Sequence, residues 1–378
     1  MDFAFTEEQE LLRSQARSFL SDRFSLEAVA ESEGRWDPAT WAEVTELGWT
    51  GVSIPEDKGG AGLGFLEEAV IFEELGRVLY PGPFFATIAL ALPALAERAE
   101  AVAAGELTAT LAWAEPGGPH TLTDLEGIAT EARPEGGAWQ LTGEKALVPD
   151  LGSVQTVVVA ARGPDGLGLF AVEGGTRESL PTMDSTRALG RLRLEREPAT
   201  LLVEPGAAEE VLHRTRVRAL AALALEAVGI GAAATALAIQ HASTREQFGR
   251  PIGVYQAVSH SVVDAYVGVE LGRSLAYWAA WCVAEGDEQA PIAAAAAKAQ
   301  VADAAVDACE RSIQVHGGIG FTWEHVLHRL YKRAQWIQAF EGFGPVLRAE
   351  VAAALLDVSD AESEVLVEQQ TLETQEVA

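Results

Sequence analysis

The sequence predicts an α+β protein with an N-terminal helical domain at residues 1–106, a small middle β-domain at 107–205, a C-terminal four-helix bundle at 206–357 and an acidic tail at 358–378. Three changes of pattern along the chain predict this order. Apolar residues recur three and four positions apart in the first part, short β-type runs separated by turns follow, and long alanine-rich helical runs return at the end.

The first part contains three helical runs, EEQELLRSQARSFL, WAEVTELGW and FLEEAVIFEELGRVL. Asp37 and Pro38 predict a capped helix start, with Pro38 at the first helical position. The segment SIPEDKGGAGLG, at 53–64, is rich in glycine and predicts a loop between two of these helices.

Runs typical of strands fill the middle part: TATLAWAE, GIATEARP, AWQLTGEKALV, TVVVAAR and LGLFAVE. They alternate or are rich in β-branched residues, and PEGG predicts a hairpin that joins two of them. We therefore expect a β-domain of about six to eight strands.

Long helices are expected in the last part, at 207–244, 254–284, 291–315 and 323–340. Alanine-rich faces such as IAAAAAKAQVADAAVDA would let these helices approach closely in a bundle. The residues from 359 onward are acidic with few aromatics, which predicts a frayed or partner-dependent arm.

Composition narrows the class of protein. The formal charge of −29 argues against nucleic acid as a partner, because phosphates would be repelled over most of the surface. Two cysteines, Cys282 and Cys309, occur outside any CxxC pair. They indicate a reducing cytoplasm, with no structural disulfide and no zinc or other metal site.

Two segments bear on membranes and export. The N-terminal stretch MDFAFTEEQELL is acidic and lacks the basic-then-apolar order of a signal peptide. The run from Ala219 to Ile239 has about the length of a membrane span, yet it is mostly alanine and carries Glu226. We expect a buried bundle helix there, no membrane span, and a cytoplasmic protein.

The stretch AQWIQAFEGFGP, at 334–345, sets the carboxylate of Glu341 among apolar residues. Helical spacing predicts Glu341 on one stripe with Ile337 and beside Phe340, with Gly342 ending the helix. Apolar neighbours and the unsatisfied carbonyls of a helix end would both raise the pKa of Glu341 toward the range that suits a general base. The alternative is a glutamate that bends out into solvent at the helix end.

Two further features suit an anionic ligand. Arg245 follows a long helix where the chain must turn, and its guanidinium could hold a diphosphate through paired hydrogen bonds. The alternative is an arginine that caps the helix or pairs with Glu246. Gly317, Gly318 and Gly320 would let the backbone approach a ligand, although glycines after a helix often only end it.

Five segments together resemble the acyl-CoA dehydrogenase family along nearly the whole chain. They are STREQFGRPIGVYQAVSH (243–260), IQVHGGIGFTWEH (313–325), HRLYKRAQWIQAFEG (328–342), WAEPGG (113–118) and LTGEKALV (141–148). The resemblance implies an FAD enzyme that dehydrogenates an acyl-CoA thioester, with a proton removed from Cα and a hydride passed to flavin N5. It also implies a tetramer, with electron transfer flavoprotein as the electron acceptor.

The resemblance assigns roles to residues at one end of the bundle. Arg245, Phe248, Gln314, Gly317 and Gly318 would contact the FAD of a neighbouring subunit.

The resemblance also places Glu341 at the position of the catalytic base. Some members of the family carry the base on the first bundle helix, about seven residues before Glu226, where this chain has Ala219 and Leu220. Glu226 is therefore a reserve candidate, and a polar contact within the bundle is the simpler interpretation of that residue.

In the β-domain, Ala114, Glu115 and Val148 match flavin-binding positions, but the match departs from the family pattern. Ala114 stands where a flavin-bonding threonine is frequent, and Leu147 and Pro149 replace a common Trp-x-Thr pair. Pro149 has neither a hydroxyl nor a backbone N–H.

Three hypotheses follow. The chain acts alone as a homotetrameric enzyme, or it is a partner subunit that completes FAD sites in a heterotetramer, as unlike subunits do in steroid-degrading relatives. The third is another flavin or binding function on the same fold, such as an oxygen-using oxidase or an acyl-carrier dehydrogenase.

Overall fold

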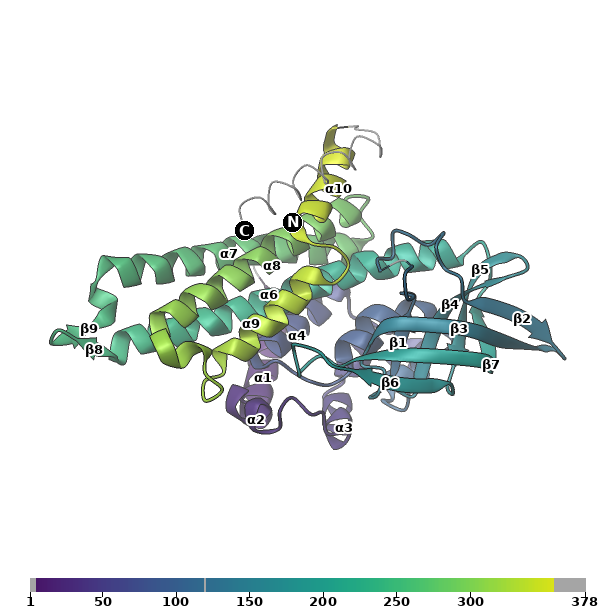
Figure 1. The fold of residues 1–378 in the computed structure, drawn as a ribbon, viewed down its shortest axis with the longest axis horizontal. Coiled ribbons are helices and arrows are strands. Elements are labelled where there is room, and N and C mark those ends of the chain that lie inside the picture. The colour runs from purple at the N-terminus through teal and green to yellow at the C-terminus, as the bar shows by residue number, and fades with distance from the viewer. Residues whose placement is uncertain (1–4, 119, 357–378) are drawn as a thin grey trace. The chain divides into compact units, whose positions relative to one another are not determined.

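The computed structural model describes residues 5–118 and 120–356, so the predicted acidic tail lies outside the described residues. Helices come first, strands follow, and long helices return, which confirms the predicted fold class (Figure 1). The chain divides into two compact units. The bundle unit comprises Met1–Glu31, Ala69–Tyr80 and Leu220–Ala378, and the sheet unit comprises Ser32–Glu68 and Pro81–Ala219. The domain boundaries drawn from the sequence stay predictions.

The sheet unit contains a seven-stranded sheet with the order β1-β4-β2-β3-β7-β5, and β6 pairs with β7. Because β5 also pairs with β4, the sheet closes on itself. Its strands are β1 (Ala109–Ala112), β2 (Glu131–Glu135), β3 (Ala138–Pro149), β4 (Thr156–Gly163), β5 (Gly166–Val172), β6 (Thr176–Leu180) and β7 (Leu189–Val203).

The predicted hairpin joins β2 to β3. Glu135 pairs with Ala138, and Gly136 and Gly137 form the two-residue turn with φ of 62° and 86°. Positive φ at both turn positions matches the twist of the flanking strands, which is why glycine is favoured there. The strands β6 and β7 were not predicted. On β7 the buried Leu192 and Leu194 alternate with charged residues, which is the period of a half-buried strand, whereas β6 has no buried residue.

The core of the sheet is apolar and fully buried. Val157 and Val159 on β4 cluster with Phe170 on β5 and Leu192 on β7. Trp139 packs against this cluster, with its ring centroid 5.2 Å from that of Phe170.

Short helices accompany the sheet. They are α3 (Ala39–Glu46), α5 (Ala99–Ala103), the 3-10 turns η1 (Trp49–Gly51), η2 (Glu56–Lys58), η4 (Leu92–Ala94) and η5 (Ala96–Arg98), and the π-helical η3 (Phe85–Ala91). Asp37 caps α3 by accepting a hydrogen bond from the Ala39 amide at 3.0 Å. Pro38 is the N-cap rather than the first helical residue, one position earlier than predicted.

The bundle unit is built from helices. They are α1 (Glu7–Arg23), α2 (Leu26–Glu31), α7 (Gln256–Glu285), α8 (Ala290–His316), α9 (Leu327–Ala339) and α10 (Gly344–Leu356). The helices α4 (Phe65–Val78) and α6 (Ala208–Thr244) run from one unit into the other. The small elements are the strands β8 (Glu246–Gln247) and β9 (Arg250–Pro251) and the turns η6 (Ile252–Val254) and η7 (Gly317–Phe321).

Three of the four predicted bundle helices lie within two residues of their expected bounds. The fourth, expected at 323–340, begins at Leu327, after η7 and the turns that follow it. The helix α10 was not predicted.

Glycine lets α4 and α6 pack backbone against backbone. A Cβ at Gly76 would lie 2.1 Å from the carbonyl oxygen of Glu226, and one at Gly229 would lie 2.0 Å from that of Glu73. Neither distance is tolerable, so both positions need glycine.

By length and composition α6 could cross a membrane, with a mean hydropathy of 1.9 over its most apolar window. However, 78% of that window is buried inside the structure. The core helix of a bundle passes the same test, and this is the interpretation we keep.

Candidate active site

Glu341 lies beyond the helix that was predicted to carry it. The helix α9 ends at Ala339, Phe340 is extended, and Glu341 has a left-handed φ of 58°. The prediction that Glu341 shares a helical stripe with Ile337, and that Gly342 ends the helix, is therefore wrong. The chain must instead turn within a few residues to enter α10 at Gly344.

The Glu341 residue is 2% exposed, so it does not bend out into solvent. The prediction also assumed that the backbone carbonyls at this helix end lack hydrogen-bond partners, but two of them have one. Nζ of Lys298, on α8, donates to the carbonyl oxygen of Gln338 at 2.9 Å and to that of Gly342. Lys298 is fully buried, so a cationic donor meets this helix end from inside the bundle.

A second residue of α8 holds the other side of the same turn. Asp303 accepts a hydrogen bond from Nε2 of Gln338 at 2.8 Å and forms an ion pair with Arg348 on α10. Sequence reasoning missed both Lys298 and Asp303, since nothing in the local pattern of α8 shows which helix they face.

The reserve candidate Glu226 forms an ion pair with Arg333 on α9. The Arg333 side chain is 0% exposed and that of Glu226 is 4% exposed. A carboxylate paired with a buried guanidinium is a structural contact of the bundle, as the simpler interpretation of the sequence had it.

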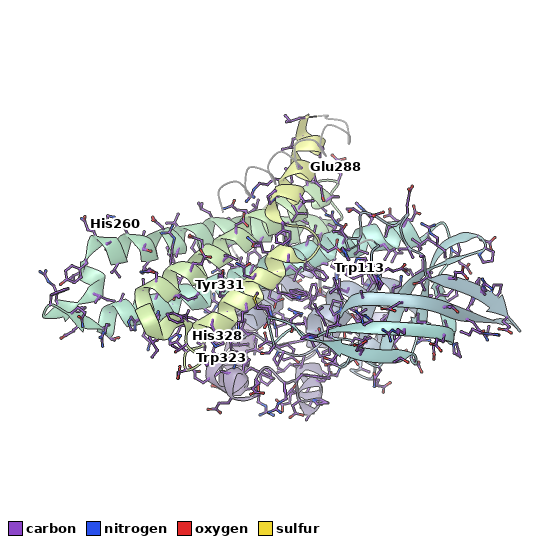
Figure 2. The ribbon with its side chains drawn as sticks, viewed as in Figure 1. Trp113, His260, Glu288, Trp323, His328 and Tyr331 are labelled. Carbon is purple, nitrogen blue, oxygen red and sulfur yellow. The ribbon has the colours of Figure 1, made fainter. Side chains whose placement is uncertain are left out.

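The opposite end of α9 lies beside the ends of α6 and α8. The rings of His241 on α6 and His316 on α8 stack with centroids 4.2 Å apart, and His325 lies 4.6 Å from His316. Burial lowers the pKa of His241 and of His325, and the neighbouring imidazole of His316 lowers both further. Figure 2 shows Trp323 and His328 at this end of α9, where their rings meet edge to face at 4.6 Å.

The stacked rings show that the ends of α6 and α8 lie side by side, and the predicted cofactor residues follow or adjoin these two helix ends. Arg245 follows His241 by one helical turn, and Gln314 precedes His316 on α8. Phe248, at the tip of the β8–β9 hairpin, is 91% exposed. A Cβ built at Gly317 or Gly318 would meet no atom within 4 Å, so the backbone there is open to a ligand.

These residues fit the diphosphate end of a dinucleotide. Within residues 5–118 and 120–356 the guanidinium of Arg245 has no hydrogen bond or ion pair, and Gln314 is exposed. An uncommitted guanidinium and a side-chain amide are donors of the kind that bind phosphate oxygens.

The structure separates this set from Glu341. The helix α9 has 13 residues, which corresponds to a length of about 20 Å. Gly317 and Gly318 precede its start, whereas Glu341 follows its end (Figure 1). Glu341 and the predicted diphosphate-binding residues therefore lie at opposite ends of one helix.

In the sheet unit, the main chain joins two of the predicted flavin-binding segments. The Ala146 amide donates to the carbonyl oxygen of Ala114 at 2.8 Å, next to a bulge in β3. At this bulge Leu147 has a left-handed φ of 53° and is 43% exposed, whereas Val148 is buried. Ala114 is buried as well, and Trp113 beside it is labelled in Figure 2.

The carboxylate of Glu115 is hydrogen-bonded to other residues of the sheet unit. It accepts hydrogen bonds from the amides of Ala129 and Thr130, from Oγ1 of Thr130, and from Nζ of Lys145 at 2.6 Å. Burial alone would raise the pKa of Glu115, but the charge of Lys145 and these hydrogen bonds lower it. The side chain thus ties the Ala129–Thr130 segment to β3.

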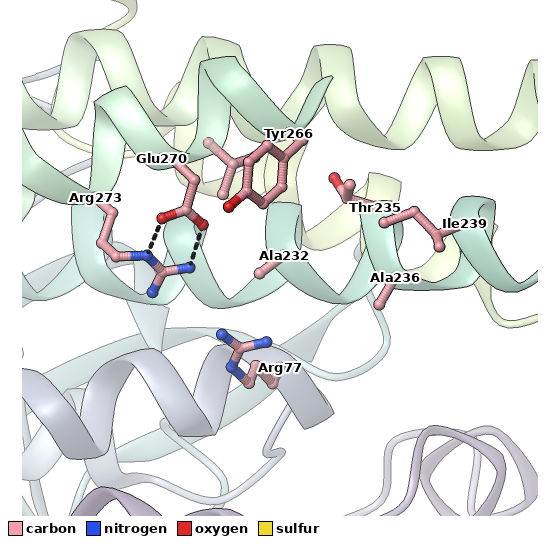
Figure 3. A pocket seen from close by; sticks show the side chains of 9 residues that line it. Arg77, Ala232, Thr235, Ala236, Ile239, Tyr266, Glu270 and Arg273 are labelled. Atoms are coloured by element: carbon pink, nitrogen blue, oxygen red, sulfur yellow. Dashed lines mark hydrogen bonds and ion pairs between the residues drawn. The ribbon is translucent and has the colours of Figure 1, made fainter. Parts of the chain in front are cut away.

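A pocket of about 210 Å³ lies among α4, α6 and α7 (Figure 3). Arg273 and Glu270, both on α7, form one ion pair in its wall, and Arg77 of α4 pairs with Glu73. The residues predicted to form the active site lie outside it. Among the residues that the structure describes, no group of three or more His, Cys, Asp or Glu side chains could hold a metal ion.

Comparison with known proteins supports the resemblance seen in the motifs. Residues 6–101 match the model for the acyl-CoA dehydrogenase N-terminal domain, and 206–356 match that for the C-terminal domain. The acyl-CoA dehydrogenase IpdE2 of Mycobacterium tuberculosis is 32% identical over 335 residues, which cover 87% of this chain and 91% of that protein.

Solved structures agree. Butyryl-CoA dehydrogenase from Megasphaera elsdenii has a TM-score of 0.87 at 26% identity, covering 94% of this chain and 100% of that one. A structure described as the Tcur3481–Tcur3483 steroid ACAD has a TM-score of 0.80 at 31% identity, covering 93% and 98%. The fold and these matches define an oxidoreductase that acts on acyl-CoA. The chain belongs to the acyl-CoA dehydrogenase family, whose members bind FAD.

Proposed function

We propose that this chain catalyses the FAD-dependent α,β-dehydrogenation of an acyl-CoA thioester, with Glu341 as the general base. The observation that carries the proposal is the burial of a carboxylate in the turn between α9 and α10, in a chain of this family. A left-handed backbone at a residue other than glycine is uncommon, and such residues cluster at active sites.

The chain's own residues would do two things. The carboxylate of Glu341 takes the proton from Cα of the thioester, and the electron pair of that C–H bond becomes the new Cα–Cβ double bond. Bound FAD would accept the hydride that leaves Cβ. Arg245, Gln314 and the Gly317–Gly318 backbone would hold the diphosphate of that cofactor by charge-assisted hydrogen bonds.

The first test is the visible absorption spectrum of the protein expressed alone, with the ratio of flavin to protein. A ratio near one flavin per chain supports an autonomous enzyme. Glu341→Gln should then bind flavin normally and lose roughly 100-fold or more in turnover, the usual contribution of a general base. Full activity in Glu341→Gln would exclude this residue as the base.

A second candidate function is that of a partner subunit in a heteromeric acyl-CoA dehydrogenase. The observation that favours it is the loss of flavin-facing groups at Ala114, Leu147 and Pro149, while Arg245 and Phe248 remain exposed. The similar Tcur3481–Tcur3483 structure is described by two names, which agrees with a pair of unlike chains. A folded but colourless protein that FAD cannot reconstitute, and that gains flavin when co-expressed with an unlike subunit, would establish this function.

We also propose a tetramer, of like or unlike chains. Val263, Val267 and Leu271 form an exposed apolar stripe on α7, of the kind that a neighbouring subunit covers. Sedimentation analysis would measure the assembly. We further propose that electron transfer flavoprotein is the electron acceptor, which reduction assays would test. We also propose a cytoplasmic location, which cell fractionation would test.

A further inference from the structure

We infer that Lys298 is a positioning residue that holds the turn carrying Glu341, an inference that rests on the proposed role of Glu341 as base. Lys298 lies in the first half of α8, in an alanine-rich stretch, and is fully buried. A lysine is seldom buried so completely unless its amino group has partners. Here Nζ donates hydrogen bonds to two backbone carbonyls, one on each side of Glu341.

The positions of these two carbonyls explain what the lysine does. Gln338 lies in the last turn of α9, and Gly342 follows Glu341. One ammonium group therefore bridges the end of the helix and the residue after the glutamate. The bridge spans the residues that leave helical geometry, namely Phe340 with ψ of 131° and Glu341 with φ of 58°.

A left-handed backbone at a residue other than glycine costs energy and persists only where its surroundings impose it. Glu341 and Gly342, with φ of 58° and 104°, together reverse the chain before α10. The two hydrogen bonds from Lys298 draw the carbonyls on either side of this reversal toward α8. They thereby fix the direction in which the Glu341 side chain leaves the backbone.

Asp303 reinforces the same turn from the next part of α8. Its carboxylate accepts a hydrogen bond from Nε2 of Gln338 at 2.8 Å and forms an ion pair with Arg348, in the first part of α10. A Cβ at Gly344 would approach Nη1 of Arg348 to 2.7 Å and Oδ2 of Asp303 to 3.1 Å, so the chain packs closely around this pair. Two residues of α8 thus hold the turn. Lys298 binds backbone carbonyls of the turn, and Asp303 binds the side chains of Gln338 and Arg348 on either side of it.

The chemical consequence concerns the position of the base. A general base must lie within hydrogen-bond reach of the proton it removes, and a displacement of about 1 Å can cost about 100-fold in rate. Loss of Lys298 should therefore slow the chemical step rather than weaken binding of the thioester.

The experiment compares Lys298→Met, which keeps the length of the side chain and removes its donor, with Lys298→Arg, which keeps a cationic donor. Hydrogen exchange followed by mass spectrometry should show faster exchange in residues 339–344 of Lys298→Met, with the rest of α8 and α9 unchanged. We expect kcat to fall by about 10- to 100-fold at unchanged KM and flavin content, and Lys298→Arg to recover part of the loss.

A matched control is Lys58→Met. Nζ of Lys58 also donates to a backbone carbonyl, that of Ala96 at 2.7 Å, but it does so at the surface of the sheet unit. This variant should leave both the exchange of 339–344 and kcat as in the wild type.

Three results would overturn the inference. One is a folded Lys298→Met protein with wild-type exchange in 339–344 and wild-type kcat. Another is exchange that rises throughout α8 and α9, which would make the lysine a structural residue only. If Lys298→Met does not fold, the milder Asp303→Ala variant decides, and unchanged exchange and kcat there would also refute it. Failure of the proposed function is distinguishable, because it removes dehydrogenation from the wild type as well.

Discussion

Arg333 on α9 donates a hydrogen bond to the carboxylate of Glu226 on α6, and both side chains are buried within the bundle unit. The pair joins two helices that are far apart in the sequence. It also explains why a glutamate is tolerated in the most apolar run of the chain, since a guanidinium supplies the partner that burial would otherwise remove.

Breaking this pair should destabilise the fold. Arg333→Met leaves the Glu226 carboxylate without its buried cation, and we expect a loss of about 3–5 kcal/mol in the free energy of unfolding, measured by urea denaturation. The double variant Glu226→Gln/Arg333→Met should recover part of the loss. Arg348→Met, which removes a half-exposed ion pair, should cost at most about 1 kcal/mol. Equal losses for Arg333→Met and Arg348→Met would contradict this prediction.

Gly229→Ala should also be costly, by about 3 kcal/mol, because its Cβ would lie 2.0 Å from the carbonyl oxygen of Glu73. Gly268→Ala on α7 is the matched control. Its Cβ would approach Ala304 only to 3.8 Å, so the better helix former should stabilise the protein by up to about 1 kcal/mol. Thermal and urea unfolding of the two variants measure the contrast. A neutral Gly229→Ala would mean that α4 and α6 do not pack this closely.

Because the pKa of Lys145 is lowered by burial, we expect the free energy of unfolding to depend on pH in the alkaline range. Burial lowers the pKa of Lys145 to about 8 from 10.5, although the Glu115 carboxylate acts in the opposite direction. Between these two values the unfolded chain binds more protons at this residue than the folded chain, so the free energy of unfolding rises with pH. Relative to Glu115→Gln/Lys145→Met, which lacks both groups, the wild type should gain stability across that window. Parallel curves for the two proteins would show that Lys145 titrates normally.

Arg245→Gln should lower flavin binding without changing stability. The guanidinium makes no hydrogen bond or ion pair within residues 5–118 and 120–356 that its removal would break, whereas a diphosphate would lose a charge-assisted bond. We expect flavin affinity to fall by about 10-fold or more, measured by titration of the protein stripped of flavin. Arg250→Gln, in the same hairpin but with its guanidinium over the Tyr255 ring, should bind flavin as the wild type does. Unchanged affinity in Arg245→Gln would remove this residue from the cofactor site.

Local patterns predicted much of the fold, because helices and hairpins are set by interactions between near neighbours. The period of apolar residues located α6, α7 and α8 to within two residues, and the two glycines of PEGG identified the hairpin. The same reasoning missed β6, β7 and α10. In β6 no buried residue marks a period, whereas in β7 the alternation of Leu192 and Leu194 with charged residues is visible in the sequence. The helix α10 begins at a glycine-proline pair that looks like a terminator.

For the candidate site, the sequence indicated which residues to examine but not their geometry. The motifs pointed to Glu341, Arg245 and Gln314. They could not show that α9 ends before Glu341, or that about 20 Å of helix separates Glu341 from the glycine loop.

The sequence by itself thus determined the class of fold, the family and the identity of the candidate residues, since these depend on local periodicity and on short motifs. The tertiary structure alone decided which charges meet. Lys298 reaches the turn of Glu341, Arg333 reaches Glu226, and Lys145 reaches Glu115. Each contact joins residues that are distant along the chain, and a buried charge finds its partner only when packing has placed the two elements side by side.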